Sequence, residues 1–161
     1  MSDGNGALPD GWKKSTIGEI ASLITKGSSP KWQGFDYADS GVLFIRSQNV
    51  RWGSLDLEDV QCLPKGFREK HRSSTIKVGD VLLNLVGASV GRAAIATDEL
   101  DDSNCNQAVG IIRLAESGVI KDYLLRFLLS PEAQRHIHGT KVDVARANFN
   151  LKDVRQTRVP V

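Results

Sequence analysis

The pattern of apolar residues changes near Lys121, and this change constrains the fold more than any other feature of the sequence. Before it, apolar residues come in short runs between glycines and polar residues, as in Val42–Ile45 and Val81–Val86. Such runs are typical of buried strands. After Lys121 the apolar residues recur at the period of a helix: Tyr123, Leu124, Phe127 and Leu128. Strands followed by helices predict an α+β fold.

Turn and capping residues predict where further elements begin. A turn at Gly79-Asp80 precedes the strand at 81–86, and 92–96 is its expected hairpin partner. Residues 108–114 form another apolar run of strand type. Thr16-Ile-Gly-Glu19 matches a capping box, which predicts a helix. Its apolar face would comprise Ile17, Ile20, Ala21 and Ile24.

The C-terminal part carries two more helix signals. Ser130-Pro131 is a favourable start for a helix that ends near His138, because serine caps a helix well and proline fits its first position. Residues 148–153 indicate another helix start. By contrast, 26–41 is rich in glycine and serine and predicts a long loop.

The length of 161 residues suits one domain. We expect a flexible leader at 1–7 and one α+β domain at 8–161. The domain would hold a single curved mixed β-sheet, short flanking helices and long polar loops.

The overall charge hides an uneven distribution. The formal net charge is only +2, from 21 basic and 19 acidic residues. Residues 65–77 nevertheless hold five basic side chains and a single acidic one, and 126–161 is also basic. An acidic run at 98–102 separates the two segments. Basic segments of this kind are compatible with a nucleic-acid partner or with an acidic protein partner.

Two features concern the compartment in which the protein acts. No stretch is long and apolar enough to cross a membrane, and the first residues have no secretory signal. Cys62 and Cys105 are far apart and lack metal-type spacing, which favours reduced thiols. We therefore expect a cytoplasmic protein with no membrane contact.

One motif raises the possibility of catalysis. Gly87-Ala-Ser-Val-Gly91 matches the G-x-S-x-G pattern of a serine hydrolase, with Ser89 as nucleophile. In such enzymes the serine turn leads directly into a helix, whereas here a strand-type segment follows. A glycine-rich hairpin turn explains the motif without a nucleophile. His136-Ile-His138 is poorly spaced for a shared metal on one helix face, so no metal site is expected.

The polar loops instead carry donor and acceptor side chains of the kind that read base edges in DNA. Arginine pairs with guanine, and asparagine or glutamine pairs with adenine, in the major groove. Lysines neutralise phosphates. A small serine hydrolase built on Ser89 and a protein-interaction domain for an acidic partner stay open as alternatives.

Several blocks, in order, resemble the target recognition domains of type I restriction–modification specificity subunits. They are Leu8-Pro-Asp-Gly-Trp12, Thr16–Ile20, Lys26-Gly-Ser-Ser-Pro30, Val42–Arg46 with Gln48-Asn-Val50, Lys77–Leu83 with Gly87–Gly91, Asn104–Val109, Asn148-Phe-Asn-Leu151 and Val159-Pro-Val161. Each block is weakly specific by itself, but their order covers nearly the whole chain.

The resemblance implies a function. It implies a non-catalytic subunit in which each domain reads one half of a split site in double-stranded DNA. Modification (methyltransferase) and restriction (translocase and nuclease) subunits would be its partners. S-adenosylmethionine, ATP and magnesium would belong to those partners, so this chain would hold no cofactor. Because the blocks cover one domain, we expect the N-terminal domain of a two-domain subunit, ending before its spacer helix.

The expected DNA-contacting residues follow from the polar loops and the resemblance together. They are Lys26, Ser28, Ser29, Lys31, Arg46, Gln48, Asn49, Arg51, Lys65, Arg68, Lys70, Arg72, Ser89, Arg92, Asn106, Lys141, Arg146 and Asn148.

Overall fold

The computed structural model describes residues 6–116, 118–139 and 149–161. Its helices are α1 (Ile17–Ile20), α2 (Lys65–Lys70), α3 (Lys121–Leu128), α4 (Pro131–Gly139) and α5 (Leu151–Gln156), with short 3-10 turns η1 (Lys31–Gln33), η2 (Ser47–Asn49), η3 (Arg72–Ser74) and η4 (Asp98–Leu100). The strands are β1 (Lys14–Thr16), β2 (Ala21–Lys26), β3 (Val42–Ile45), β4 (Gln61–Leu63), β5 (Val81–Asn84), β6 (Ala93–Ile95), β7 (Asn104–Cys105), β8 (Val109–Leu114) and β9 (Arg158–Pro160). This composition confirms the α+β class.

The strands form three sheets in the described residues, which corrects the expectation of one. The central sheet has the order β2-β8-β5-β6 and is antiparallel throughout. A second sheet has the order β4-β3-β7, in which β3 and β7 are parallel. The third is the pair β1-β9, which joins the two ends of the domain. The mixed character was therefore expected correctly, but the division into sheets was not.

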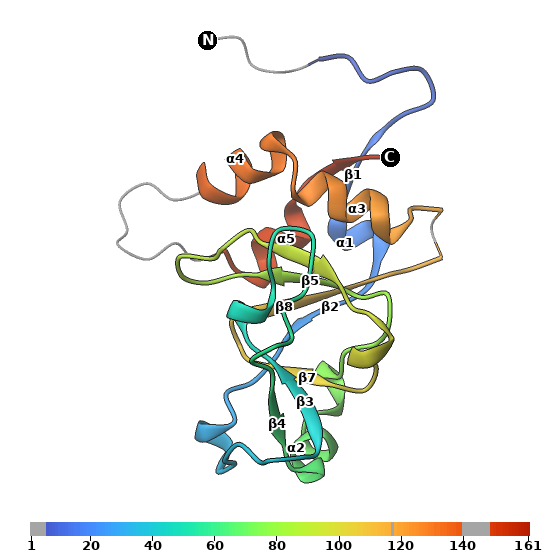
Figure 1. Cartoon of the computed structure of the whole chain (residues 1–161). Coiled ribbons are helices and arrows are strands. Elements are labelled where there is room, and N and C mark those ends of the chain that lie inside the picture. Colours follow the sequence, from blue (N-terminus) through green and yellow to red (C-terminus); the bar gives the residue numbers. More distant parts are fainter. Residues whose placement is uncertain (1–5, 117, 140–148) are drawn as a thin grey trace.

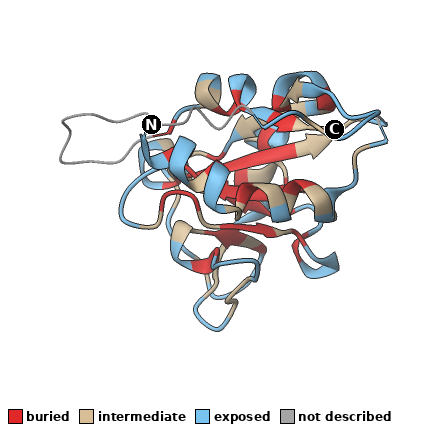
Figure 2. Cartoon of the chain, turned by 90° about the horizontal axis from the view of Figure 1, so that it is seen from above, coloured by how far each residue is buried: buried red, intermediate tan, exposed pale blue. Residues whose placement is uncertain are grey.

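The central sheet is covered on both faces. Helices α1, α3, α4 and α5 lie on one side of it in Figure 1, and the β4-β3-β7 sheet with α2 lies on the other. Val81 and Leu83 belong to the core under the helices, whereas Leu82 belongs to the core against the second sheet. Alternate side chains of a strand point to opposite faces, so every residue of β5 is buried. Figure 2 shows the buried segments along these central strands and exposed outer faces on the helices.

Most local expectations are confirmed. The hairpin β5-β6 pairs Val81 with Ile95, and α3 and α4 begin at Lys121 and Pro131. Ser130 Oγ accepts a hydrogen bond from the Ala133 amide (3.2 Å), as an N-cap should. In the described part of the chain, no helix has the length and apolar character that a membrane crossing requires.

One expected helix is mostly a strand. Thr16 and Glu19 do form a capping box, but α1 has only four residues. Ala21 is already extended (φ −97°, ψ 142°), and Ala21–Lys26 pairs with β8. The expectation that Ala21 and Ile24 continue the helix is therefore wrong, because pairing with β8 overrides the local helical spacing.

A buried ion pair fixes the start of β5. Asp80 is 1% exposed, and both of its carboxylate oxygens accept hydrogen bonds from Arg113 of β8, each at 2.8 Å. Arg113 also donates to the Thr75 carbonyl (3.1 Å), and the Lys77 amide donates to Asp80 (2.8 Å). This network joins the turn before β5 to the neighbouring strand.

Candidate nucleic-acid interface

The loop after β3 has a defined shape that a buried asparagine sets. Asn49 is 2% exposed; its Oδ1 accepts from the Arg46 amide (2.9 Å) and its Nδ2 donates to the Asp56 carbonyl (2.9 Å). Both ends of the amide are thus used inside the protein. The expectation that Asn49 contacts DNA is corrected, because its side chain has almost no surface to offer.

Arg46 is also engaged within the protein. Its guanidinium donates to the Asp59 carbonyl (2.6 Å) and carboxylate (3.0 Å), and it lies 5.9 Å from the centre of the Tyr37 ring. Its side chain is only 17% exposed. Through these contacts Arg46 connects the end of β3 to the segment around Asp59.

Gln48 and Arg51 are the exposed members of this group. Gln48 Nε2 donates to Asp59 (3.2 Å), and Arg51 pairs with Asp56 (3.1 Å). Each contact is a single surface interaction, which water or a ligand can replace at small cost. Their remaining donors face solvent, as direct reading of base edges requires.

The loop between β5 and β6 lies against this first loop. Asn84, fully buried at the end of β5, donates to the Ser47 carbonyl (2.8 Å) and to Ser89 Oγ (3.2 Å). The Gly53 amide donates to the Ala93 carbonyl (2.9 Å). We call residues 46–55 and 86–92 together the paired-loop surface, because these bonds hold them as one unit.

Ser89 has no hydrolase geometry. Its motif forms a turn that leads into strand β6 and not into a helix. The described hydrogen bonds of His136 and His138 are with Thr157, just after α5, and with Gln134 of α4. The structure therefore supports the interpretation of Gly87–Gly91 as a hairpin turn.

The basic residues of 65–72 lie on α2 and the turn that follows it. Lys65, Lys70 and Arg72 are exposed, while Arg68 is half-buried and donates to the Asp102 carbonyl (3.5 Å). A hollow of about 370 Å³ is lined by Arg68, Glu69, Arg72, Thr75, Lys77 and Asp102. Three cations and two carboxylates line it, so the excess charge is positive and suits a phosphate.

Lys77 and Asp102 form an ion pair at the edge of that hollow. The hydrogen bond between them raises the pKa of Lys77 and lowers the pKa of Asp102. Both groups therefore stay charged near neutral pH, and Asp102 offsets part of the positive charge around α2.

The remaining expected residues lie elsewhere. Lys26 is exposed at the end of β2, and in the loop that follows Lys31 is exposed and Ser28 and Ser29 are half-buried. Asn106 Oδ1 accepts from the Ala108 amide (3.1 Å) and so shapes the turn before β8. Lys141, Arg146 and Asn148 lie outside the described residues. Apart from Asn106, the described members of the expected set thus divide between the paired-loop surface, α2 with the turn after it, and the end of β2 with the loop that follows.

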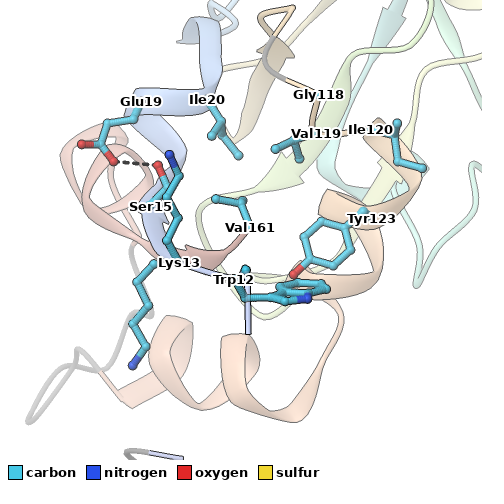
Figure 3. Close-up of a pocket in the computed structure, with 12 residues that line it drawn as sticks. Trp12, Lys13, Ser15, Glu19, Ile20, Gly118, Val119, Ile120, Tyr123 and Val161 are labelled. Atoms are coloured by element: carbon cyan, nitrogen blue, oxygen red, sulfur yellow. Dashed lines mark hydrogen bonds between the residues drawn. The ribbon is translucent and has the colours of Figure 1, made fainter. Parts of the chain in front are cut away.

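A separate hollow lies where the two ends of the domain meet. It has a volume of about 960 Å³, and Trp12, Val119, Ile120, Tyr123 and Val161 line much of it. Figure 3 shows the Trp12 and Tyr123 rings side by side, and their centres are 6.0 Å apart. Tyr123 Oη also donates to the Pro160 carbonyl (2.6 Å). Lys13, Lys14, Ser15 and Glu19 complete the lining, which is therefore part apolar and part polar.

Comparisons with known proteins point to one group of relatives. No protein-family model matches the chain. The type I restriction enzyme EcoBI specificity subunit of Escherichia coli is 25% identical over 154 residues, which are 96% of this chain and 32% of that protein. The MjaVIII specificity subunit of Methanocaldococcus jannaschii is 25% identical over 128 residues, or 78% of this chain and 29% of that protein. The chain therefore spans about a third of the length of these relatives.

The same group appears among solved structures. The HsdS subunit of Thermoanaerobacter tengcongensis superposes with a TM-score of 0.64 at 21% identity, over 98% of this chain and 35% of that one. The S subunit of a type I restriction–modification system of M. genitalium gives a TM-score of 0.60 at 12% identity, over 100% and 36%. The chain shares their fold along its whole length.

Proposed function

We propose that this chain, a homologue of type I restriction enzyme specificity subunits, is a target recognition domain that reads one half of a split site in double-stranded DNA. The observation that carries the proposal is the similarity to specificity subunits over 96% of the chain. The exposed donors of Gln48 and Arg51 and the half-buried guanidinium of Arg92, on two loops that are hydrogen-bonded to each other, support it, since base reading needs rigidly held polar groups.

We further propose that the chain is non-catalytic and acts in the cytoplasm within a larger complex. Its partners would be modification (methyltransferase) and restriction (translocase and nuclease) subunits. S-adenosylmethionine, ATP and magnesium would be bound by those partners. The names of the relatives support this proposal, because each is a specificity subunit of a type I restriction enzyme.

Some side chains of 46–51 make contacts within the protein and others are exposed. Substitutions in this segment can therefore separate a role in folding stability from a role in base reading. Arg46→Ala removes the two hydrogen bonds that the guanidinium donates to Asp59, so we expect it to lower the free energy of unfolding by about 2 kcal/mol. Gln48→Ala should leave the unfolding midpoint unchanged and cost about 1–3 kcal/mol of duplex binding at one position of the half-site. Urea unfolding and binding to duplexes with single base changes measure the two effects. If Gln48→Ala binds every duplex of the series as tightly as the wild type does, Gln48 does not take part in base reading.

The basic residues of α2 lead to a second prediction, on salt. Lys65→Ala or Lys70→Ala should weaken binding evenly across sequences and reduce the log–log salt slope by about one, because each lysine would neutralise one phosphate. The matched control is Lys121→Ala, since Lys121 lines a hollow with the acidic Asp98, Glu99 and Asp122. That variant should keep the wild-type slope. An unchanged slope in both α2 variants would place the DNA backbone away from α2.

A further inference from the structure

Trp52 stands at the tip of a tight turn within the paired-loop surface. A bridge between Val50 and Leu55 closes the turn, and the Arg51 amide donates to the Ser54 carbonyl (2.9 Å). Gly53 supplies the left-handed conformation that the turn needs (φ 81°). The position of Trp52 is therefore set by the backbone on both sides of it.

The turn is also fastened to the neighbouring loop. The Gly53 amide donates to Ala93 (2.9 Å), and the Arg92 guanidinium lies 6.0 Å from the centre of the Trp52 ring. Arg92 is half-buried, and its Nε is a buried donor with no partner in the described structure. The ring and the cation are thus held together before any ligand binds.

Trp52 is nevertheless 56% exposed. A large aromatic side chain on a rigid support and in contact with water is typical of a binding surface, where it gains contact area at little cost in conformational entropy. The other exposed tryptophans differ in setting. Trp12 packs beside Tyr123 at the end of the domain, and Trp32 lies in η1, 89% exposed.

Charge distinguishes the two flanks of the turn. On the side of Trp52 lies Arg92, from the loop between β5 and β6. Ser54 and Leu55, which follow Trp52 in the turn, line a hollow with three carboxylates and one lysine (Asp98, Glu99, Asp122 and Lys121), so that second flank has a net negative charge. A polyanion is attracted to the first flank and repelled by the second.

We propose that Trp52, held by Arg92, is a DNA-contacting residue whose ring packs on a sugar or base while Arg92 faces the adjacent phosphate or base edge. This inference rests on the proposed function and extends it to a residue pair. A large aromatic ring gains much contact area when it packs on a nucleotide, so one ring can contribute a measurable share of affinity.

The first test measures affinity with matched tryptophan variants of the whole 161-residue chain. A fluorescently labelled pool of random-sequence duplexes is titrated at low salt, where phosphate contacts are strongest. We expect Trp52→Ala to weaken binding by about tenfold, the scale of one truncated aromatic contact at an interface, and Trp52→Phe to recover part of the loss. Trp32→Ala and Trp12→Ala should bind as the wild type does. Thermal unfolding of each variant confirms that it is folded.

The second test uses tryptophan emission as a local probe. A chain that keeps only Trp52, with Trp12→Phe and Trp32→Phe, should lose emission on adding duplex, because a stacked base quenches the ring. The complementary Trp52→Phe variant should show no change while it still binds.

The outcomes separate the inference from the proposed function. Salt-dependent duplex binding by the wild type with no loss in Trp52→Ala overturns the role of Trp52 and leaves the function standing. If Trp52→Ala binds DNA as the wild type does but no longer assembles with a protein subunit, the inference is also overturned. Trp52 would then be a contact to protein. If the wild type binds no duplex at low salt, both proposals fail.

Discussion

Asp80→Ala is expected to lower the free energy of unfolding by about 3 kcal/mol, because it leaves the Arg113 guanidinium without its carboxylate partner. The pair has two hydrogen bonds of 2.8 Å, and Asp80 is almost fully buried. Arg113 is partly exposed, at 33% of its side chain, so water relieves some of the cost. Urea denaturation measures the loss.

Two further variants test the cause of this loss. The double variant Asp80→Ala with Arg113→Met should be more stable than Asp80→Ala alone, since it removes the unpaired charge. Lys77→Ala breaks the exposed pair with Asp102 and should leave stability nearly unchanged. If Asp80→Ala is no more damaging than Lys77→Ala, the buried pair does not hold β5 and β8 together.

Gly27→Ala is expected to destabilise the fold by about 3 kcal/mol or more, because a Cβ there would overlap the Cys105 carbonyl. The neighbouring atoms are backbone and cannot rotate away. The Gly27 amide donates to the Val109 carbonyl (3.3 Å), and the Ser28 amide donates to the Cys105 carbonyl (3.1 Å). The close backbone contact at Gly27 is therefore part of the packing of the end of β2 on β7 and β8. Thermal unfolding of the purified variant measures the effect.

Gly66→Ala is the matched control. Gly66 lies in α2, where a Cβ would meet only the Phe35 ring at an ordinary 3.6 Å. Alanine favours a helix over glycine, so this variant should be more stable by about 0.5 kcal/mol. If Gly27→Ala lowers the free energy of unfolding and Gly66→Ala raises it, the close approach of the backbone at Gly27, and not the loss of a glycine as such, causes the destabilisation. A neutral Gly27→Ala would contradict the packing of this loop.

Local signals in the sequence were enough to predict the elements with clear boundaries. The hairpin β5-β6 and helices α3 and α4 have short connections or capping residues, so neighbours in sequence determine them. The strands β1 and β9 could not be predicted this way. Each has only three residues, and they pair Lys14 with Pro160 across the length of the domain. Pairing over such a separation leaves no local pattern to read.

The sequence names the polar side chains of the candidate site but not the contacts that those side chains make. The segment after β3 supplies four of the expected DNA-contacting residues, and hydrogen bonds within the loop hold it. The sequence does not show that Asn49 points inward or that Arg46 reaches Asp59, because loop conformation decides both. Trp52 was not among the expected residues. Its exposure and its contact with Arg92 depend on two loops that come together only in the fold.

The central claim, reading of a DNA half-site, is tested most directly by selection from random duplexes. The chain in its assembled complex is incubated with a pool of randomised duplexes at several salt concentrations, and the retained molecules are sequenced. We expect enrichment of a split motif, with one half lost when Gln48 and Arg51 are replaced by alanine, and affinity that falls steeply with salt. Retention of all sequences in equal proportion, with a flat response to salt, would contradict the account.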